Sequence, residues 1–128
     1  MRSRSNSVVR RLSSATIFKS PLGTGPITGI LEFEGDRLVI EYDQPRFLRK
    51  TRHANVEIPA DEIDELVYQT RISRNSILLR ALYRDTVKSI PWSKSLEISF
   101  TIPRREKERA MELVDRFEEY VEKSTTDA

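Results

Sequence analysis

The chain has 128 residues, a length that suits a single domain. It has no cysteine, which excludes a disulfide framework, a thiol nucleophile and a cysteine-based zinc site. No apolar run approaches the roughly 18 residues that a membrane-spanning helix needs, and no apolar signal segment stands near the start. We therefore expect a cytoplasmic protein.

The net charge of +2 is unevenly distributed along the chain. Residues 1–31 contain five basic side chains and no acidic one, whereas residues 32–103 contain 11 basic and 12 acidic side chains. Residues 104–128 contain six basic and eight acidic side chains. A nucleic-acid-binding domain carries its positive charge on the folded part itself. We therefore expect no specific nucleic-acid partner.

Residues 1–26 form a basic, Ser- and Arg-rich segment that we predict to be flexible. Its composition also matches that of an organelle transit peptide. Within it, Arg10 and Arg11 are candidates for contact with a partner or an anionic surface. Residues 8–15 fit a short helical face, but residues 15–18 fit equally well a short strand that closes one edge of a sheet.

The middle of the chain has the pattern of short antiparallel strands. The clearest pair is residues 28–34 and 37–43, where apolar and polar residues alternate on either side of a tight turn at Gly35. We predict a loop over residues 44–53 and an irregular stretch over residues 85–94, in which residues 87–90 are a candidate strand. Further strands are predicted over residues 56–58, 63–71, 76–84 and 95–102.

One long amphipathic helix is predicted over residues 104–123, directly after Pro103. Its apolar residues recur at helical spacing: Ala110, Met111, Leu113, Val114, Phe117, Tyr120 and Val121. A single helix after a run of strands must bury this stripe on those strands. At about 30 Å the helix is longer than a short sheet is wide, which makes Tyr120 a candidate contact for a partner.

Residues 29–42 (GILEFEGDRLVIEY), 56–63 (VEIPADEI) and 96–100 (LEISF) follow one another as hairpin, strand and strand, and Arg104, Arg105 and the helix come next. This order resembles the small bacterial proteins of the pleckstrin-homology (PH) superfold. The resemblance implies an α+β, mainly β fold: a strongly bent antiparallel sandwich or partly open barrel of six or seven strands, plugged by the C-terminal helix. The domain then covers residues 27–123, with a frayed tail over residues 124–128.

Resemblance to this superfold implies a scaffold for interactions and does not fix one activity. PH domains that bind phosphoinositides use Lys and Arg in and beside the first hairpin loop. Here the turn of the residue 28–43 hairpin is Glu34-Gly35-Asp36-Arg37, which is short and mostly acidic. We therefore do not expect inositol-phosphate binding.

The main candidate interaction surface is a basic stretch that surrounds an apolar pair: Phe47 and Leu48 with Arg46, Arg49, Lys50 and Arg52. In one interpretation the apolar pair enters the interface of an anionic membrane while the cations meet lipid head groups. In the other, which we favour, the apolar pair folds back onto the sheet and the cations are solvated. Other arginines are expected to pair across the sheet with glutamates: Arg71, Arg74, Arg80 and Arg84 with Glu32, Glu34, Glu41 and Glu97.

No catalytic residues, cofactor site or metal site are predicted. His53 is the only histidine, and general-base catalysis needs a placed partner, so we interpret it as structural or solvated. The acidic cluster at residues 61–65 lacks the glycine and the oxygen-rich loop of a calcium site. Gly23 and Gly25 do not form a phosphate loop, because Pro26 and a strand follow them. No small-molecule substrate is identified.

These patterns favour a non-enzymatic interaction module that binds a protein partner or a second copy of itself. The reason is that the edge strands of such a sheet need a partner or protection. The alternative is peripheral binding to an anionic membrane through the basic N-terminal segment and the loop at residues 46–52. An enzyme is the least favoured possibility, because no nucleophile–base pair is evident.

Overall fold

The structure is a computed structural model that describes residues 15–20, 27–46, 49–72 and 74–127. Within these ranges, the side chains of residues 44–51, 126 and 127 lie outside the description. The strands are β1 (Ala15–Lys19), β2 (Thr28–Glu34), β3 (Arg37–Arg46), β4 (Arg49–Pro59), β5 (Ile63–Thr70), β6 (Asn75–Ala81) and β7 (Glu97–Ile102). The helices are the 3-10 turns η1 (Ala60–Glu62) and η2 (Arg104–Glu106) and the α-helices α2 (Arg84–Val87) and α3 (Lys107–Asp127).

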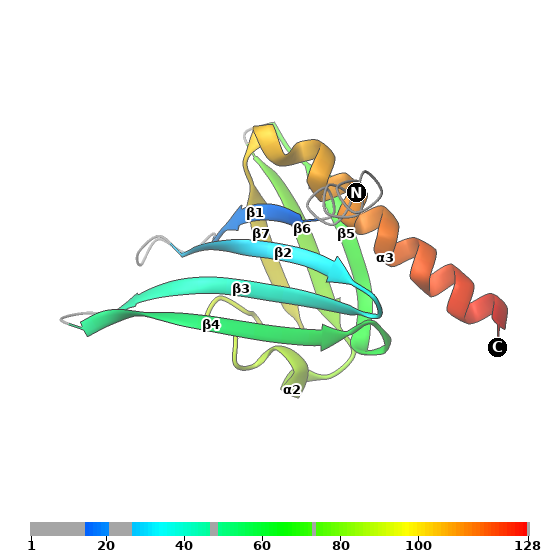
Figure 1. The fold of residues 1–128 in the computed structure, drawn as a ribbon, viewed down its shortest axis with the longest axis horizontal. Coiled ribbons are helices and arrows are strands. Elements are labelled where there is room, and N and C mark those ends of the chain that lie inside the picture. The colour runs from blue at the N-terminus through cyan, green and yellow to red at the C-terminus, as the bar shows by residue number, and fades with distance from the viewer. Residues whose placement is uncertain (1–14, 21–26, 47–48, 73, 128) are drawn as a thin grey trace, which may run out of the picture.

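The seven strands form one antiparallel sheet in the order β4-β3-β2-β1-β7-β6-β5. The sheet is not closed, so β4 and β5 are its two edges. The sheet is strongly bent, because β2 to β4 run across the direction of β5 to β7 at a steep angle (Figure 1). Helix α3 lies over one end of this bend (Figure 1). The prediction of a mainly β fold with a C-terminal helix packed on the strands is confirmed.

The N-terminal strand β1 lies at the centre of the sheet, so the prediction that residues 15–18 close an edge is wrong. Thr16 and Phe18 are buried, and Phe18 packs edge-on against Phe100 with ring centroids 4.9 Å apart. The predicted flexible segment over residues 1–26 thus contains a central strand. Residues 1–14 and 21–26 lie outside the described residues.

The hairpin of β3 and β4 is longer than predicted, and the loop expected over residues 44–53 is wrong. Gln44 pairs with Arg52 and Arg46 pairs with Arg49, with a register shift between Gln44 and Arg46. The last β3 residue paired with β2 is Asp43. Pro45 is tolerated because this part of β3 has a neighbour on one side only and the ladder is irregular there.

The candidate strand at residues 87–90, within the irregular stretch over residues 85–94, does not form. The one-turn helix α2 ends at Val87, and Val87, Ile90 and Trp92 are buried. The Trp92 ring packs edge-on against Tyr42, with ring centroids 5.0 Å apart. This segment therefore closes the core at the open side of the bent sheet with side chains and not with a strand.

Helix α3 covers the core, as its apolar stripe predicts. Ala110, Leu113, Val114 and Phe117 are buried, and Phe117 meets Phe33 edge-on at 5.8 Å between ring centroids. Its start is fixed by a buried carboxylate: Glu106 Oε1 accepts hydrogen bonds from the backbone N–H of Ile17 (3.1 Å) and from Thr16 Oγ1 (3.4 Å). The helix is thereby tied to the central strand.

Replacing Phe117 by Ala should lower the free energy of unfolding by about 3–5 kcal/mol, because it removes a buried ring and leaves a cavity. The matched control is Met111→Ala on the same helix, since Met111 is exposed and should cost less than about 1 kcal/mol. Urea unfolding followed by circular dichroism measures both. Equal losses would show that α3 does not cover the core.

Replacing Gly29 by Ala should also destabilise the fold, by about 3 kcal/mol. An added Cβ at Gly29 would overlap the backbone oxygen of Glu41 and lie 2.7 Å from Phe18 Cζ. Thr28→Ala, one residue earlier in β2 and exposed, is the control and should change stability little. If both variants have the same midpoint urea concentration as the wild type, the close contact between Phe18 and Gly29 of β2 is contradicted.

Candidate functional site

A basic cavity of about 550 Å³ lies where the end of β1, the β5–β6 turn, the end of β7 and the start of α3 meet. Five of its lining residues are cationic: Lys19, Arg71, Arg74, Arg104 and Lys107. The other lining residues are Thr70, Ile72, Asn75, Thr101, Ile102 and Pro103. No carboxylate is among the described lining residues. This volume is within the range of small-ligand pockets.

The fold positions the five cations from distant parts of the chain. Lys19 is the last residue of β1 and pairs with Thr101 of β7. Arg71 and Arg74 close the β5–β6 turn, where the Arg71 N–H donates to the Arg74 carbonyl oxygen at 2.8 Å. Arg104 and Lys107 stand at the start of the C-terminal helical segment. The positive end of the helix dipole of α3 lies at the same place.

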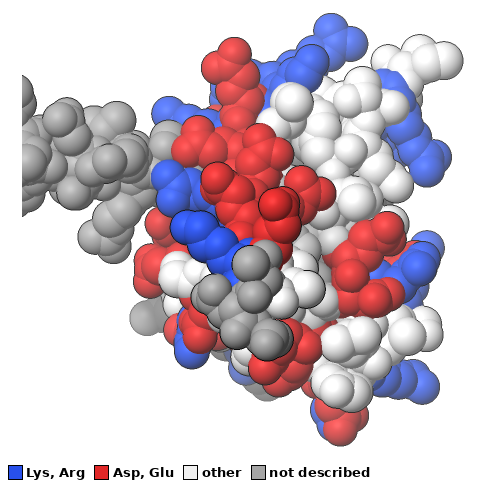
Figure 2. Space-filling view, turned by 90° about the vertical axis from the view of Figure 1, so that its right-hand side faces the viewer, with Lys and Arg blue, Asp and Glu red and all other residues white. Residues whose placement is uncertain are grey.

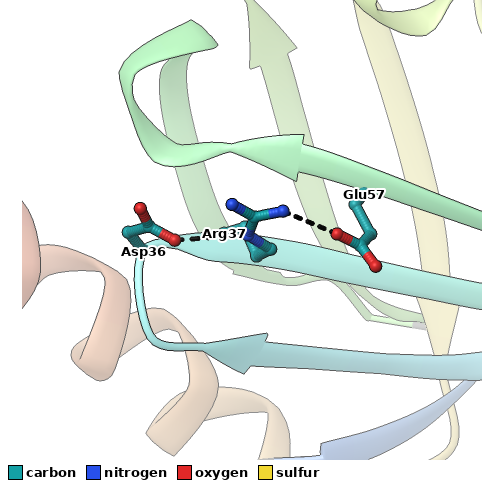
Figure 3. Close-up of polar contacts among 3 residues, drawn as sticks. All are labelled: Asp36, Arg37 and Glu57. Carbon is teal, nitrogen blue, oxygen red and sulfur yellow. Dashed lines mark hydrogen bonds and ion pairs between the residues drawn. The ribbon is translucent and has the colours of Figure 1, made fainter.

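The five cavity cations have no carboxylate partner among the described residues, whereas some cations elsewhere do. Elsewhere, Arg37 lies between Asp36 and Glu57, with its Nη1 2.7 Å from Glu57 Oε1 (Figure 3). Arg80 Nη2 lies 2.6 Å from Glu97 Oε2, as the cross-sheet pairing predicts. Among the described residues, none of the five cavity cations forms an ion pair. No described carboxylate therefore pairs with these five positive charges, which favours an anionic ligand.

An exposed apolar side chain stands at the rim of the cavity. Ile72 lies in the β5–β6 turn with Arg71 beside it, and it is fully exposed. Arg71 and Arg74 also line a neighbouring hollow of about 440 Å³, whose one described carboxylate, Glu97, is held by Arg80. The rim therefore combines unpaired cations with an apolar tip.

The interaction residues predicted from sequence do not line this cavity. Arg46 and Arg49 end the strands of the β3–β4 hairpin, and Arg52 is exposed on β4. The side chains of Arg46, Arg49 and Lys50, and residues Phe47, Leu48, Arg10 and Arg11, lie outside the description. Tyr120 is half-buried, with its ring 5.9 Å from that of Phe33. Contact of these residues with a partner stays a prediction.

Sequence reasoning missed the cavity because its members are distant in the chain and their pairing was assumed. Arg71 and Arg74 were expected to pair with glutamates across the sheet, and in the structure they do not. One signal was present in the sequence: Arg71 and Arg74 flank an isoleucine in a turn, which leaves apolar and basic side chains together at a loop tip.

His53 lies outside the cavity, on the outer side of the β3–β4 hairpin. Its Nδ1 lies 2.8 Å from Asp43 Oδ1, and its Nε2 lies 3.6 Å from Glu41 Oε2. The hydrogen bond to Asp43 raises the pKa of His53 above its usual value of about 6.5. The ring is exposed and paired with carboxylates, which fits the predicted structural or solvated role.

The described residues contain neither a metal-binding cluster nor a membrane-spanning helix. No group of three or more His, Asp and Glu side chains there is placed to hold a metal ion. No helix in the described part of the chain is long and apolar enough to cross a membrane.

Comparison of the chain with protein-family models, with curated proteins and with solved structures finds no match. The functional argument therefore depends on the geometry of the site.

The raised pKa of His53 gives a test by titration, because the chain has a single histidine. A raised folded-state pKa means that the imidazolium favours the fold. This contribution is complete below a pH of about 6.5 and is lost as the pH rises through the folded pKa. Asp43→Asn should move the pKa measured by NMR back toward 6.5, whereas Glu57→Gln on the same strand pair should not. A wild-type pKa at or below 6.5 contradicts the pairing.

Proposed function

We propose that the protein is a non-enzymatic module of PH-like fold that binds anionic membrane surfaces with the end that carries the basic cavity. The observation that carries this proposal is the set of five cations around one cavity, without a carboxylate among its described lining residues. The membrane function was the alternative in the sequence analysis. The unpaired cavity cations, which the sequence did not reveal, now favour it.

The strand order supports the PH-like part of this proposal. Because β1 precedes β2, the first hairpin is β1–β2, and the acidic turn at residues 34–37 belongs to the second. The acidic turn at residues 34–37 therefore does not bear on phosphate binding at the first hairpin. Lys19, a cavity cation, ends β1 beside the first hairpin turn, where phosphoinositide-binding PH domains place basic residues.

The chemistry of the cavity suits a lipid surface. Lipid phosphates would meet the unpaired cations, and the exposed Ile72 at the rim would enter the interfacial region. Each cation near an anionic membrane contributes on the order of 1 kcal/mol. Five such cations therefore supply on the order of 5 kcal/mol before any contribution from the basic residues of the N-terminal segment and of the β3–β4 hairpin.

The opposite charge at the far end of α3 supports one orientation on the membrane. Glu118, Glu119 and Glu122 lie in the second half of this helix, Asp115 lies shortly before it, and all four are exposed. The space-filling view shows carboxylates gathered in the middle of the face toward which α3 projects (Figure 2). A negative membrane repels this end of the molecule and attracts the cavity end.

Binding to a protein partner is the second candidate, and the open sheet favours it. The edge strands β4 and β5 each have a neighbour on one side only, and exposed edges are common places for another chain to add.

Flotation with vesicles of neutral lipid, with and without phosphatidylserine, tests the membrane proposal. The wild type should bind the anionic vesicles and release them as salt is added. The variant Arg71→Ser/Arg74→Ser/Arg104→Ser should bind about 100-fold more weakly, since three cations at about 1 kcal/mol each are lost.

The matched control is Arg84→Ser/Lys88→Ser/Lys94→Ser, which removes the same charge from exposed residues that do not line the cavity and should retain most of the binding. A hairpin variant, Arg46→Ser/Arg49→Ser/Lys50→Ser/Arg52→Ser, measures how much of the vesicle binding comes from the surface predicted from sequence. A wild type that ignores anionic vesicles at low salt would falsify the proposal. Equal losses in the cavity and control variants would show that net charge, and not the cavity, decides binding.

A further inference from the structure

The last part of α3 is exposed along its length. Phe117 is buried and Tyr120 half-buried, but every residue from 121 to 125 is exposed. The helix runs on past the strands at this end (Figure 1). Val121 is an exposed apolar side chain here. A helical turn that packs on nothing is only marginally stable in water, so a partner that covers it would stabilise it.

This helix end and the basic cavity have complementary unpaired charge. Asp115, Glu118 and Glu119 are exposed and form no ion pair with a described residue. The five cavity cations also form none among the described residues. The same molecule therefore carries an unpaired set of carboxylates and an unpaired set of cations. The rim of the cavity and the helix end each add one exposed apolar side chain, Ile72 and Val121.

The two sets lie apart in one molecule, because the cavity is at the first residue of α3 and the carboxylates are further along this helix. Lys107 is the first residue of α3 and lines the cavity. At about 1.5 Å per residue, Glu118 lies about 17 Å and Glu119 about 18 Å further along the axis. This length of helix separates the carboxylates from the cavity. Only the cavity of another molecule can receive them.

We propose that the protein self-associates head to tail, with the carboxylates of the free α3 end of one copy entering the basic cavity of a second copy. Each copy then offers one helix end and one cavity, so the contact is heterologous and repeats from copy to copy. The interface is polar and largely exposed, so salt weakens it. Self-association and membrane binding use the same cavity, and each excludes the other there.

Sedimentation velocity at low salt, over a range of protein concentrations, tests this proposal. The wild type should form assemblies that dissociate as salt is added. The helix variant Glu118→Lys/Glu119→Lys and the cavity variant Arg71→Glu/Arg74→Glu should each associate at least tenfold more weakly. All four positions are exposed, so circular dichroism and the melting temperature should stay close to those of the wild type.

Mixing the two variants gives the sharpest test of direction. The cavity variant keeps an intact helix end and the helix variant keeps an intact cavity, so the mixture should form a one-to-one complex and nothing larger. The control Asp64→Lys/Glu65→Lys makes the same charge change on exposed residues of β5 and should associate like the wild type.

The inference is overturned if the wild type is monomeric at low salt and high concentration, or if neither variant weakens association. Assemblies larger than two in the mixture would also overturn it. Vesicle flotation separates this inference from the membrane proposal. The helix variant should still bind anionic vesicles, while the cavity variant should not. A monomeric wild type that binds the vesicles refutes self-association alone.

Discussion

The structure depends on the placement of β1 between the two halves of the sheet. All five residues of β1 pair with β2, whereas the pairing of β1 with β7 joins Lys19 to Thr101. Phe18 fills the core on the inner side, and the buried Glu106 accepts a hydrogen bond from the backbone N–H of Ile17. A buried carboxylate that loses such a partner is costly. The sheet bend and the start of α3 are thus fixed by the same short strand.

The basic cavity is a consequence of that constraint. The contact between Glu106 and β1 brings the start of the helix to the end of the strand, and with it Arg104 and Lys107 to Lys19. The β5–β6 turn adds Arg71 and Arg74. Like charges do not gather without a cost, and here core packing on the other side of the same elements offsets their repulsion. An anion in the cavity would relieve this repulsion, so the proposed binding would also stabilise the fold.

Sequence periodicity was a good guide where one element carries its own signal. The alternation in β2 and β3, the tight turn at Gly35 and a C-terminal helix that buries an apolar stripe are local patterns, and each was predicted. Of the predicted stripe, Met111 and Val121 are exposed in the structure. β1 was misplaced because five residues do not show whether a strand has one neighbour or two. The extension of the β3–β4 hairpin past Pro45 was missed because an irregular ladder tolerates proline where a regular one does not. The cavity was missed because tertiary structure alone brings its residues together.

Charge counted along the sequence does not show where charged side chains meet. Residues 32–103 are nearly neutral in sum, which argued against a nucleic-acid partner. Salt screens exposed charges over about 8 Å at physiological ionic strength, so a ligand responds to the charges near it and not to the sum. The fold brings Arg71 and Arg74 from this stretch together with Lys19, Arg104 and Lys107, which lie outside it, in one cavity at the start of α3. Exposed carboxylates lie further along the same helix. A charged partner near one end of α3 therefore meets a different sign of charge from a partner near the other end.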